Sequence, residues 1–261
     1  MNTLKNKTIL ITKSRAEAEK SLNSLIKLGA EIVYFPTIKV VPLTHSSELS
    51  EALNMFGRFD FIVFTSTNAV EVFSDIAKQK KLDLSKLKIA VVGKSTAEEC
   101  ENLGIPVDII PDEFSAEGLL YKFSEFDLAN KKIFIPGSSL ASGELNMGLS
   151  ELGAQVYSVP IYDVVKNDLA NLKTEHQKIQ KKHPGVFIFT SPSSFSNFLK
   201  LMNVADAERF FGKSVICTIG TTTERAIRES GLVVHIVPEV FSIHGVVEAI
   251  IKYFQTTVNM A

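Results

Sequence analysis

The chain has 261 residues, of which 45% are apolar and 22% charged, the ordinary balance of a globular protein with one large or two medium-sized domains. Its formal net charge of −1 excludes the basic excess of proteins that coat nucleic acid, so we expect no nucleic-acid partner. Because no apolar run suits a membrane span or a secretory signal, we expect no membrane association and a cytoplasmic location.

The cysteines and histidines show no pattern of a redox or metal site. Cys100 falls in a helical pattern and Cys217 in a strand-like run, without a Cys-x-x-Cys pair, so we predict free buried thiols. The five histidines are scattered, with no pair at the spacing of metal ligands. We therefore expect no metal ion.

Short apolar strands alternate with amphipathic helices through the first half of the chain. The expected strands are residues 8–12, 32–35, 59–64, 88–92 and 107–110. The expected helices are residues 17–28, 46–56, 67–78, 95–103 and 115–126. Nearly continuous apolar strands separated by helices are typical of a parallel sheet covered on both faces.

The same order begins again at Lys131. Residues 133–136 repeat the first strand, residues 140–152 repeat the first helix, and Phe187-Ile188-Phe189-Thr190-Ser191 echoes Phe61-Ile62-Val63-Phe64-Thr65-Ser66. Further matches join Ile219-Gly220-Thr221 to Val92-Gly93-Lys94, and Pro238, Phe241, Ser242 and Gly245 to Pro111, Phe114, Ser115 and Gly118. The offset stays between 124 and 127 residues, which indicates duplication of a five-stranded, flavodoxin-like unit.

Two matched extended passages interrupt the repeat, at residues 29–41 and 153–165. Each begins with Gly-Ala, contains a proline (Pro36 or Pro160) and ends with Val-Val. Glycine ends helices readily because it adopts the left-handed conformation without steric cost. The passages predict two chain crossings between two similar lobes.

Four matched loops follow strands and open helices, at the edge where such sheets bind ligands. Their polar residues are Ser66, Thr67 and Asn68; Lys94, Ser95 and Thr96; Ser191, Ser193 and Ser194; and Thr221, Thr222 and Thr223. One interpretation is that these residues only cap helices. The other is that the exposed backbone N–H groups bind anions, so that four loops lining one cleft would suit a small polyanion.

Five further residues are candidates for the same site. Lys13 and Arg15 follow the first strand, where they are either solvated charges or ligands of a carboxylate, and Ser138 and Ser139 follow its repeat. Tyr162 has Ile38 as its counterpart, so duplication alone does not require it. Its phenol is either a hydrogen-bonding or proton-donating group in the cleft, or part of an amphipathic side chain that packs on a strand with its hydroxyl exposed to water.

Nucleotide cofactors are not expected. Gly93-Lys94-Ser95 lacks the P-loop glycine five residues earlier, where Lys88 stands, and no Gly-x-Gly-x-x-Gly follows the first strand.

The motifs together resemble those of the uroporphyrinogen-III synthase family over nearly the full chain. They are Phe64-Thr65-Ser66-x-Asn68-Ala69-Val70, Val92-Gly93-x-x-Thr96-Ala97, Phe114-Ser115-Ala116-Glu117-Gly118-Leu119-Leu120, Pro160-x-Tyr162, Phe189-Thr190-Ser191-Pro192-Ser193-Ser194 and Ile219-Gly220-x-Thr222-Thr223. The chain departs from the family at Thr12-Lys13-Ser14, usually Thr-Arg-Pro, and at Gly137-Ser138, usually Arg-Gly.

The resemblance implies two α/β lobes, each a five-stranded parallel sheet with helices on both faces, joined by a two-stranded β ladder with exchanged N-terminal elements. Lobe 1 would comprise residues 1–36 and 167–261, lobe 2 residues 41–161, and the ladder residues 37–40 and 162–166. The repeat alone would place a boundary near Asn130 instead.

The resemblance also implies a reaction, the closure of the linear tetrapyrrole hydroxymethylbilane with inversion of its last pyrrole ring and loss of water. Tyr162 would assist departure of hydroxide, the loops would hold the eight carboxylates, and no metal or organic cofactor would be needed. The family suggests a monomer that makes transient contact with hydroxymethylbilane synthase. The alternatives are a non-catalytic two-lobed binding protein or sensor for a small polyanion and, with less support, a partner-docking protein.

Overall fold

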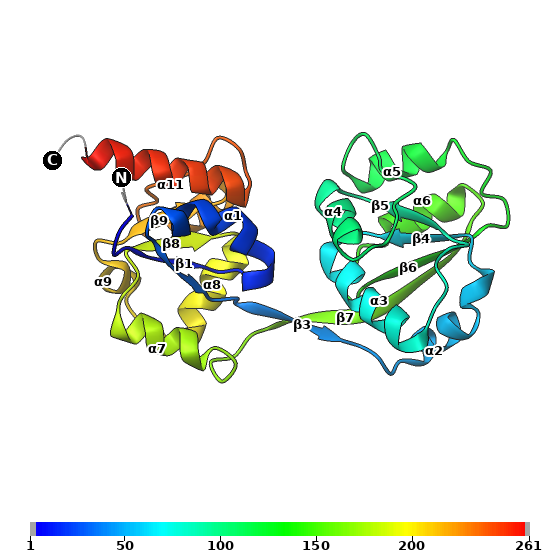
Figure 1. Ribbon diagram of the computed structural model, residues 1–261, viewed down its shortest axis with the longest axis horizontal. Helices are drawn as coiled ribbons and strands as arrows, with labels where there is room; N and C mark the ends of the chain where they lie inside the picture. Colours follow the sequence, from blue (N-terminus) through cyan, green and yellow to red (C-terminus); the bar gives the residue numbers. More distant parts are fainter. Residues whose placement is uncertain (1–3, 259–261) are drawn as a thin grey trace. The chain divides into compact units, whose positions relative to one another are not determined.

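A computed structural model describes residues 4–258, and the chain forms two compact units. Unit 1 combines the residues up to Lys39 with those from Lys166 onward, and unit 2 is the segment Val40–Val165. The repeat boundary near Asn130 therefore lies inside unit 2. Figure 1 shows each unit as a sheet with helices on both faces.

The sheet of unit 1 has four parallel strands in the order β2-β1-β8-β9. They are β1 (Thr8–Ile11), β2 (Glu31–Tyr34), β8 (Val186–Phe189) and β9 (Val215–Thr218). Every residue of β1 and β8 is buried, because the central strands of a parallel sheet are covered on both faces. In register, Ile9 lies between Ile32 and Val186.

Six helices cover this sheet among the described residues. They are α1 (Arg15–Lys27), α7 (Lys173–Lys181), α8 (Pro192–Leu201), α9 (Ala207–Phe211), α10 (Thr221–Arg228) and α11 (Ile243–Val258). Side chains of α1 and α11 share one apolar cluster, and those of α7 to α10 share the cluster on the other face. Fully buried phenylalanines such as Phe187, Phe189 and Phe198 fill the second cluster, where they pack edge to face.

The sheet of unit 2 has the order β3-β7-β6-β4-β5. Its strands are β3 (Ile38–Pro42), β4 (Phe61–Phe64), β5 (Lys88–Val91), β6 (Lys132–Ser138) and β7 (Gln155–Lys166). Neighbouring strands from β7 to β5 run parallel. On one face pack α2 (Ser47–Asn54), a short 3-10 helix (Phe56–Arg58), α3 (Thr67–Lys80) and α4 (Lys94–Asn102); on the other pack α5 (Ala116–Phe123) and α6 (Glu144–Glu151).

Both units have the strand order 2-1-3-4-5 of a doubly wound fold when equivalent strands are compared. The prediction of an α/β protein with parallel sheets and helices on both faces is confirmed. The expected helix 140–152 begins only at Glu144.

The prediction of a regular fifth strand at residues 107–110 is wrong. Only an isolated bridge joins Ile109 to Ala90, and Ile236 makes the equivalent bridge to Cys217. The backbone N–H of Ile89 donates to the Asp108 carboxylate at 2.7 Å, so a side chain takes the hydrogen bond that a strand carbonyl would accept. In unit 1 the imidazole Nδ1 of His235 accepts the equivalent bond at 3.1 Å from Ile216.

The two extended passages begin as predicted, with Gly29 and Gly153 in the left-handed region at φ +93° and +95°. They then differ. In the first passage the chain leaves the sheet at Pro36 and starts a separate strand, β3. In the second, β7 continues through Pro160 for 12 residues and leads directly to Tyr162.

The loops before α5 and α11 approach the first turn of each helix closely. The N–H groups of Gly118 and Gly245 donate to the hydroxyls of Ser115 and Ser242 at 2.9 and 3.0 Å. A Cβ at either glycine would lie 2.1 Å from a backbone carbonyl oxygen two residues before that serine. Both positions therefore require glycine.

We predict that Gly118→Ala and Gly245→Ala each lower the free energy of unfolding by about 1–3 kcal/mol, because the loop backbone must move. Urea unfolding measures this. The control variants are Gly57→Ala and Gly185→Ala, since no described atom lies within 4 Å of a Cβ there. Their unfolding free energies should change by about 0.5 kcal/mol or less. Equal losses in both sets would contradict the close approach.

Candidate functional site

The predicted loops lie at the carboxyl ends of the strands in both units. In unit 2, α3 follows β4 and α4 follows β5; in unit 1, α8 follows β8 and α10 follows β9. Since the strands of each sheet are parallel, the N-termini of both helices of a unit lie at the same edge. Within each unit the two loops therefore lie at one edge of the sheet.

The loops differ in how the helix is capped. Ser66 caps α3 by accepting from the N–H of Ala69 at 3.1 Å, and Ser191 caps α8 by accepting from the N–H of Ser194 at 3.0 Å. Ser194 Oγ in turn accepts from the N–H of Ser191, which completes a capping box. For Ser194 the capping role thus accounts for the side chain, and its exposed fraction is only 5%.

The other two helices have glycine at the N-cap, Gly93 in α4 and Gly220 in α10, with no side-chain hydrogen bond to the first turn. Their first-turn N–H groups are therefore more open to an external anion than those of the serine-capped helices. Ser95, Thr221 and Thr222 lie in these first turns, and Thr221 is exposed. The hydroxyl-bearing residues that follow them, Thr96 and Thr223, are buried.

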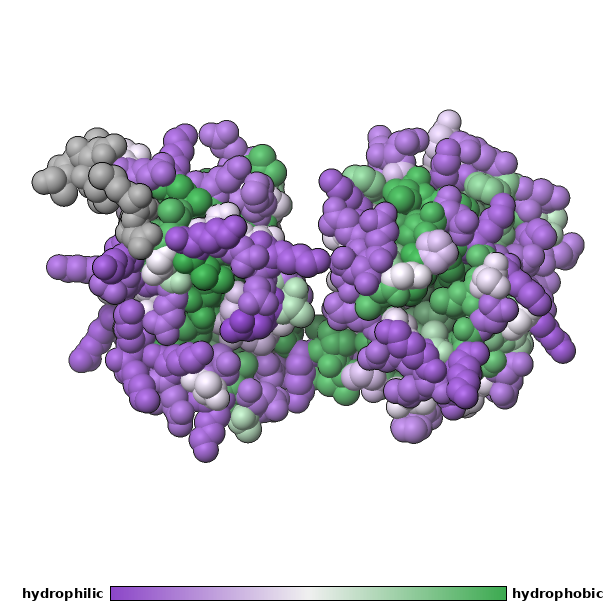
Figure 2. All heavy atoms as spheres, viewed as in Figure 1, coloured by the Kyte–Doolittle hydropathy of each residue, from purple (hydrophilic) through white to green (hydrophobic). Residues whose placement is uncertain are grey.

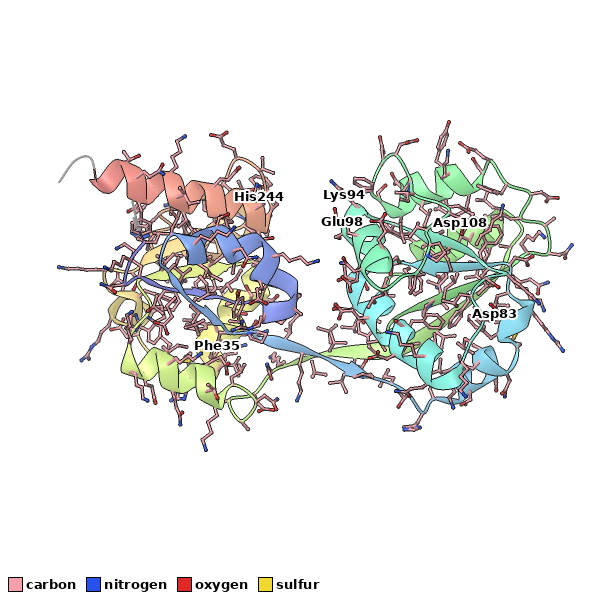
Figure 3. All side chains as sticks on the ribbon, in the orientation of Figure 1. Phe35, Asp83, Lys94, Glu98, Asp108 and His244 are labelled. Carbon is pink, nitrogen blue, oxygen red and sulfur yellow. The ribbon has the colours of Figure 1, made fainter. Side chains whose placement is uncertain are left out.

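Lys94 stands at the start of α4, where a cation interacts unfavourably with the helix dipole. Its Nζ lies 3.9 Å from the carboxylate of Glu98, one turn along the same exposed face (Figure 3). The pair is solvated, so Lys94 remains available to an anionic ligand at little cost.

A hydrogen bond joins the candidate residues Tyr162 and Ser66. The phenol oxygen lies 2.9 Å from Ser66 Oγ, and either oxygen can be the donor. The ring packs in the apolar cluster under α3, and the residue is 4% exposed. The interpretation of Tyr162 as a side chain with a wet hydroxyl is therefore wrong, because β7 directs the phenol to the N-cap of α3.

Ser138 and Ser139 lie beside Tyr162. Ser138 ends β6 and is in register with Tyr162, and the N–H of Ser139 donates to the Tyr162 carbonyl at 3.1 Å. Ser139 Oγ donates to the Asp163 carboxylate. In unit 2 the structure thus brings together the tyrosine, the first-strand serines and the loop of Ser66, with half-buried Thr67 and Asn68 in the first turn of α3.

In unit 1 the equivalent place is a hollow of about 110 Å³. It is lined by Thr12, Lys13, Glu17, Pro36, Thr37, Ile38, Thr190, Ser191, Ser193 and Ser194. Thr37 is 1% exposed, and its hydroxyl has no hydrogen-bond partner within the described part of the chain. A buried hydroxyl without a partner is costly unless a ligand or water completes it. The hollow is therefore a candidate subsite for one acidic group.

Charge in the hollow is largely balanced. Lys13 Nζ lies 2.6 Å from the Glu17 carboxylate. Burial raises the pKa of Glu17, but hydrogen bonds from Lys13 and Ser14 and the charge of Lys13 outweigh this and lower it. Arg15 points elsewhere: it pairs with Glu19 and lies 4.9 Å over the Tyr34 ring. The structure therefore places Lys13 in the hollow, but not Arg15.

Sequence reasoning missed Thr37. The one available signal was a threonine directly after Pro36 in a mainly apolar crossing passage, which is a weak indication. Its environment depends on strands β1 and β8 being neighbours, which no local pattern shows.

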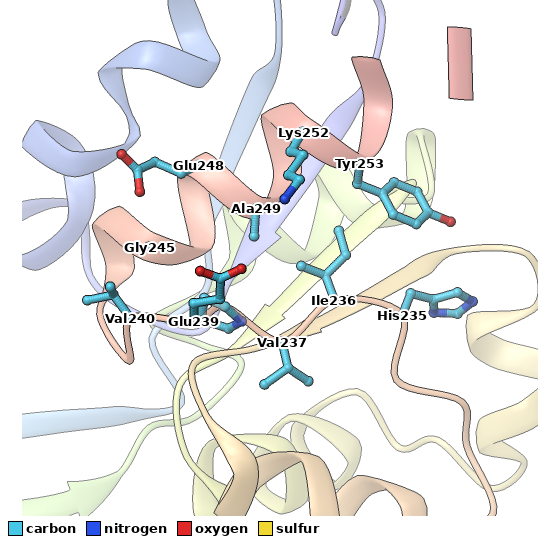
Figure 4. A pocket seen from close by; sticks show the side chains of 11 residues that line it. His235, Ile236, Val237, Glu239, Val240, Gly245, Glu248, Ala249, Lys252 and Tyr253 are labelled. Atoms are coloured by element: carbon cyan, nitrogen blue, oxygen red, sulfur yellow. The ribbon is translucent and has the colours of Figure 1, made fainter. Parts of the chain in front are cut away.

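A larger hollow of about 420 Å³ in unit 1 lies between residues 235–240 and α11 (Figure 4). Glu239, Glu248 and Lys252 line it, so carboxylates outnumber amines there. None of the predicted site residues borders it. This excess of carboxylates does not favour the binding of a polyanion in the larger hollow.

The described residues contain no cluster of histidine, cysteine or acidic side chains suited to a metal ion. No helix in residues 4–258 has the length and hydropathy to span a membrane. The prediction of free buried thiols is confirmed, and burial raises the pKa of Cys100 to about 12, with Glu99 and Glu101 contributing.

The fold and the loops define an α/β protein suited to binding a small anionic ligand through backbone donors. The family model described as uroporphyrinogen-III synthase HemD matches residues 20–248, and the chain belongs to the uroporphyrinogen-III synthase family. This confirms the resemblance seen in the motifs.

Individual relatives agree over nearly the whole length. A uroporphyrinogen-III synthase of Synechococcus elongatus is 28% identical over 264 residues, covering 96% of this chain and 97% of the relative. A uroporphyrinogen-III synthase of Chlorobaculum parvum is 25% identical over 241 residues, covering 90% and 94%. The crystal structure of uroporphyrinogen-III synthetase from Helicobacter pylori shares the fold, with a TM-score of 0.61, 17% identity and coverage of 95% and 99%.

The Ser66–Tyr162 contact predicts a thermodynamic coupling. In a double-mutant cycle of Ser66→Ala and Tyr162→Phe, the two losses of unfolding free energy should be non-additive by about 0.5–1.5 kcal/mol. Ser191→Ala is the matched control, because Ser191 is the equivalent cap in unit 1. It should combine additively with Tyr162→Phe. Additivity in both cycles would show that the contact contributes nothing.

Proposed function

We propose that this chain closes hydroxymethylbilane to uroporphyrinogen III, with inversion of the last pyrrole ring and loss of one water. The observation that carries this proposal is the family match over residues 20–248. The site supports it chemically, because the substrate is a flexible octacarboxylate and the carboxyl edges of both sheets present helix N-termini.

The reaction requires positioning more than chemical activation. Loss of hydroxide from the first ring's hydroxymethyl group leaves an electrophilic azafulvene. The fourth ring attacks through its substituted carbon to give a spiro intermediate, which fragments and closes again on the other carbon with loss of a proton. Without positioning, closure occurs without inversion. Holding the reacting rings in one geometry therefore determines which isomer forms.

Tyr162 is the proposed proton donor to the departing hydroxide. Ser66 Oγ accepts the Ala69 N–H and lies within hydrogen-bond distance of the phenol. When Ser66 donates its own proton to the phenol oxygen, the phenol proton is left for the substrate. Ser66 thus holds Tyr162 while remaining the cap of α3.

The carboxylates are proposed to bind to backbone and hydroxyl donors. The glycine-capped ends of α4 and α10 offer N–H groups, helped by Lys94, Ser95, Thr221 and Thr222. The hollow of unit 1 offers Thr37, Ser193 and Lys13. These donors act without a metal or organic cofactor.

We further propose a cytoplasmic monomer that receives its unstable substrate from hydroxymethylbilane synthase by transient contact. Membership of the family supports these assignments, and sedimentation of the purified protein with and without the synthase tests the monomer and the contact.

The proposed activity is tested by supplying purified protein with hydroxymethylbilane, oxidising the products and separating the porphyrin isomers. We expect the type III isomer in excess over the type I isomer that forms without positioning. Type I product alone, from folded protein, would exclude the synthase function.

We predict that Tyr162→Phe lowers kcat by about a hundredfold, the contribution of a general acid, while leaving the family's product isomer unchanged. The loss of unfolding free energy should be only about 1 kcal/mol, because a single hydrogen bond is removed. Turnover assays and urea unfolding measure the two effects. Full activity in this variant would remove Tyr162 from the mechanism.

We predict that Thr37→Val raises KM about tenfold, because a carboxylate in the hollow loses a hydroxyl donor. Stability should not fall, since the hydroxyl has no partner in the described part of the free protein. Thr218→Val is the matched control: Thr218 is also fully buried, with a hydroxyl unpaired among the described residues, but it does not line the hollow. An unchanged KM for Thr37→Val would exclude the subsite.

A further inference from the structure

Two phenylalanines are exposed where the rest of the chain buries this residue type. Phe114 is 57% and Phe241 61% exposed, and they are the only phenylalanines among the large exposed apolar side chains of the described residues. Hydrophilic residues dominate the surface in Figure 2. An exposed ring forgoes the stabilisation that burial of a large apolar side chain would provide.

Both rings occupy the same position of the repeat. Each lies in a Phe-Ser-x-x-Gly segment, directly before the serine that caps the following helix. The preceding residues differ, Glu113 in one copy and Val240 in the other. The two copies thus keep an exposed phenylalanine although the residue at position 113 or 240 differs between them. A general apolar patch therefore does not explain why the phenylalanine is exposed in both.

A structural role in helix capping does not explain it either. An apolar residue before an N-cap often packs on the fourth helical residue, here Leu119 or Val246. Those two side chains are fully buried, yet both phenylalanine rings remain more than half exposed and neither belongs to an apolar cluster. Each phenylalanine has the sequence spacing of a hydrophobic staple, in which an apolar residue before the N-cap packs on the fourth helical residue. The packing that would make such a staple stabilising is absent at both positions.

Phe241 lies against Gly220. A Cβ at Gly220 would lie 3.3 Å from the ring, so the ring rests on this glycine at the start of α10. One face of the ring is therefore held next to the glycine-capped helix end, and the rest is open. In unit 2, Phe114 stands at the equivalent place but does not rest on Gly93.

Resting on the proposed synthase function, we propose that Phe241, and Phe114 in the other unit, are substrate-binding residues that stack on pyrrole rings of the linear tetrapyrrole. The substrate is a chain of flat aromatic rings whose acidic side chains need donors, and an aromatic ring beside a helix N-terminus meets both requirements. Stacking on an aromatic side chain tolerates rotation in the ring plane, which a substrate that rearranges requires.

The first test compares Phe241→Leu with Val233→Ala. Val233 is also 61% exposed and in unit 1, but it precedes the bridge at Ile236 and so lies toward the opposite, amino edge of the sheet. We expect KM for hydroxymethylbilane to rise about tenfold in Phe241→Leu, with Phe241→Tyr restoring it, and to stay unchanged in Val233→Ala. Phe114→Leu should change KM in the same direction.

The second test uses the absence of tryptophan from the sequence. The Phe241→Trp substitution introduces a single indole fluorophore, and the probe is the bilane with a terminal methyl in place of hydroxymethyl, which cannot lose hydroxide. We expect saturable quenching of the indole fluorescence in the Phe241→Trp variant and no quenching in the Val233→Trp variant. This readout does not depend on turnover or on any loss of stability in Phe241→Leu.

The outcomes separate this inference from the proposed function. If the unaltered chain yields no type III isomer, the synthase function fails. If it does, but Phe241→Leu keeps its KM and the indole fluorescence is not quenched, the stacking role alone is overturned. If Phe241→Leu or Phe114→Leu alone keeps the KM of the unaltered chain, that phenylalanine is excluded as a substrate-binding residue.

Discussion

The parallel register of the buried strands is the constraint on which the rest of this structure depends. Each central strand lies between neighbours that run in the same direction, so α3 and α4 in unit 2 and α8 and α10 in unit 1 begin at the carboxyl edge of their sheets. A sheet covered on both faces favours apolar side chains within the strands, which leaves most polar chemistry to the strand ends. In both units most candidate residues therefore lie in loops and at helix starts, and Tyr162 within β7 is the main exception.

Both units have this carboxyl edge because the chain contains a repeat. Substitutions at single positions make the two edges chemically different. At one structural place unit 2 has Tyr162 in contact with Ser66, whereas unit 1 has Ile38 and a hollow beside the equivalent cap, Ser191. The Tyr162 phenol occupies this place in unit 2, and a cavity occupies the equivalent place in unit 1. The two copies thus have different chemistry on the same backbone: a hydroxyl positioned for proton transfer in one, and a small cavity in the other, where Thr37 has no partner among the described residues.

Much of this could be predicted from the sequence. The alternation of strands and helices, the repeat and the capping loops each depend on local patterns, so they could be read directly. Residues 107–110 could not, because the Asp108 side chain replaces a ladder hydrogen bond that the apolar pattern indicates. The balanced charge of Lys13 and the burial of Tyr162 also escaped prediction, since both depend on side-chain conformations and tertiary contacts.

Cationic side chains near the carboxyl edges of the sheets form ion pairs with carboxylates of the chain, and this is consistent with the proposed chemistry. Arg15 and Lys13 already have carboxylate partners, and the helix ends provide partial rather than full charges. Strong, fully charged contacts would hold a polyanion tightly in whichever conformation bound first. A substrate that must form a spiro centre, open and close again needs contacts that are individually weak and collectively sufficient. Amide donors and stacked rings meet that need, because binding that is equally strong at every stage does not raise the rate.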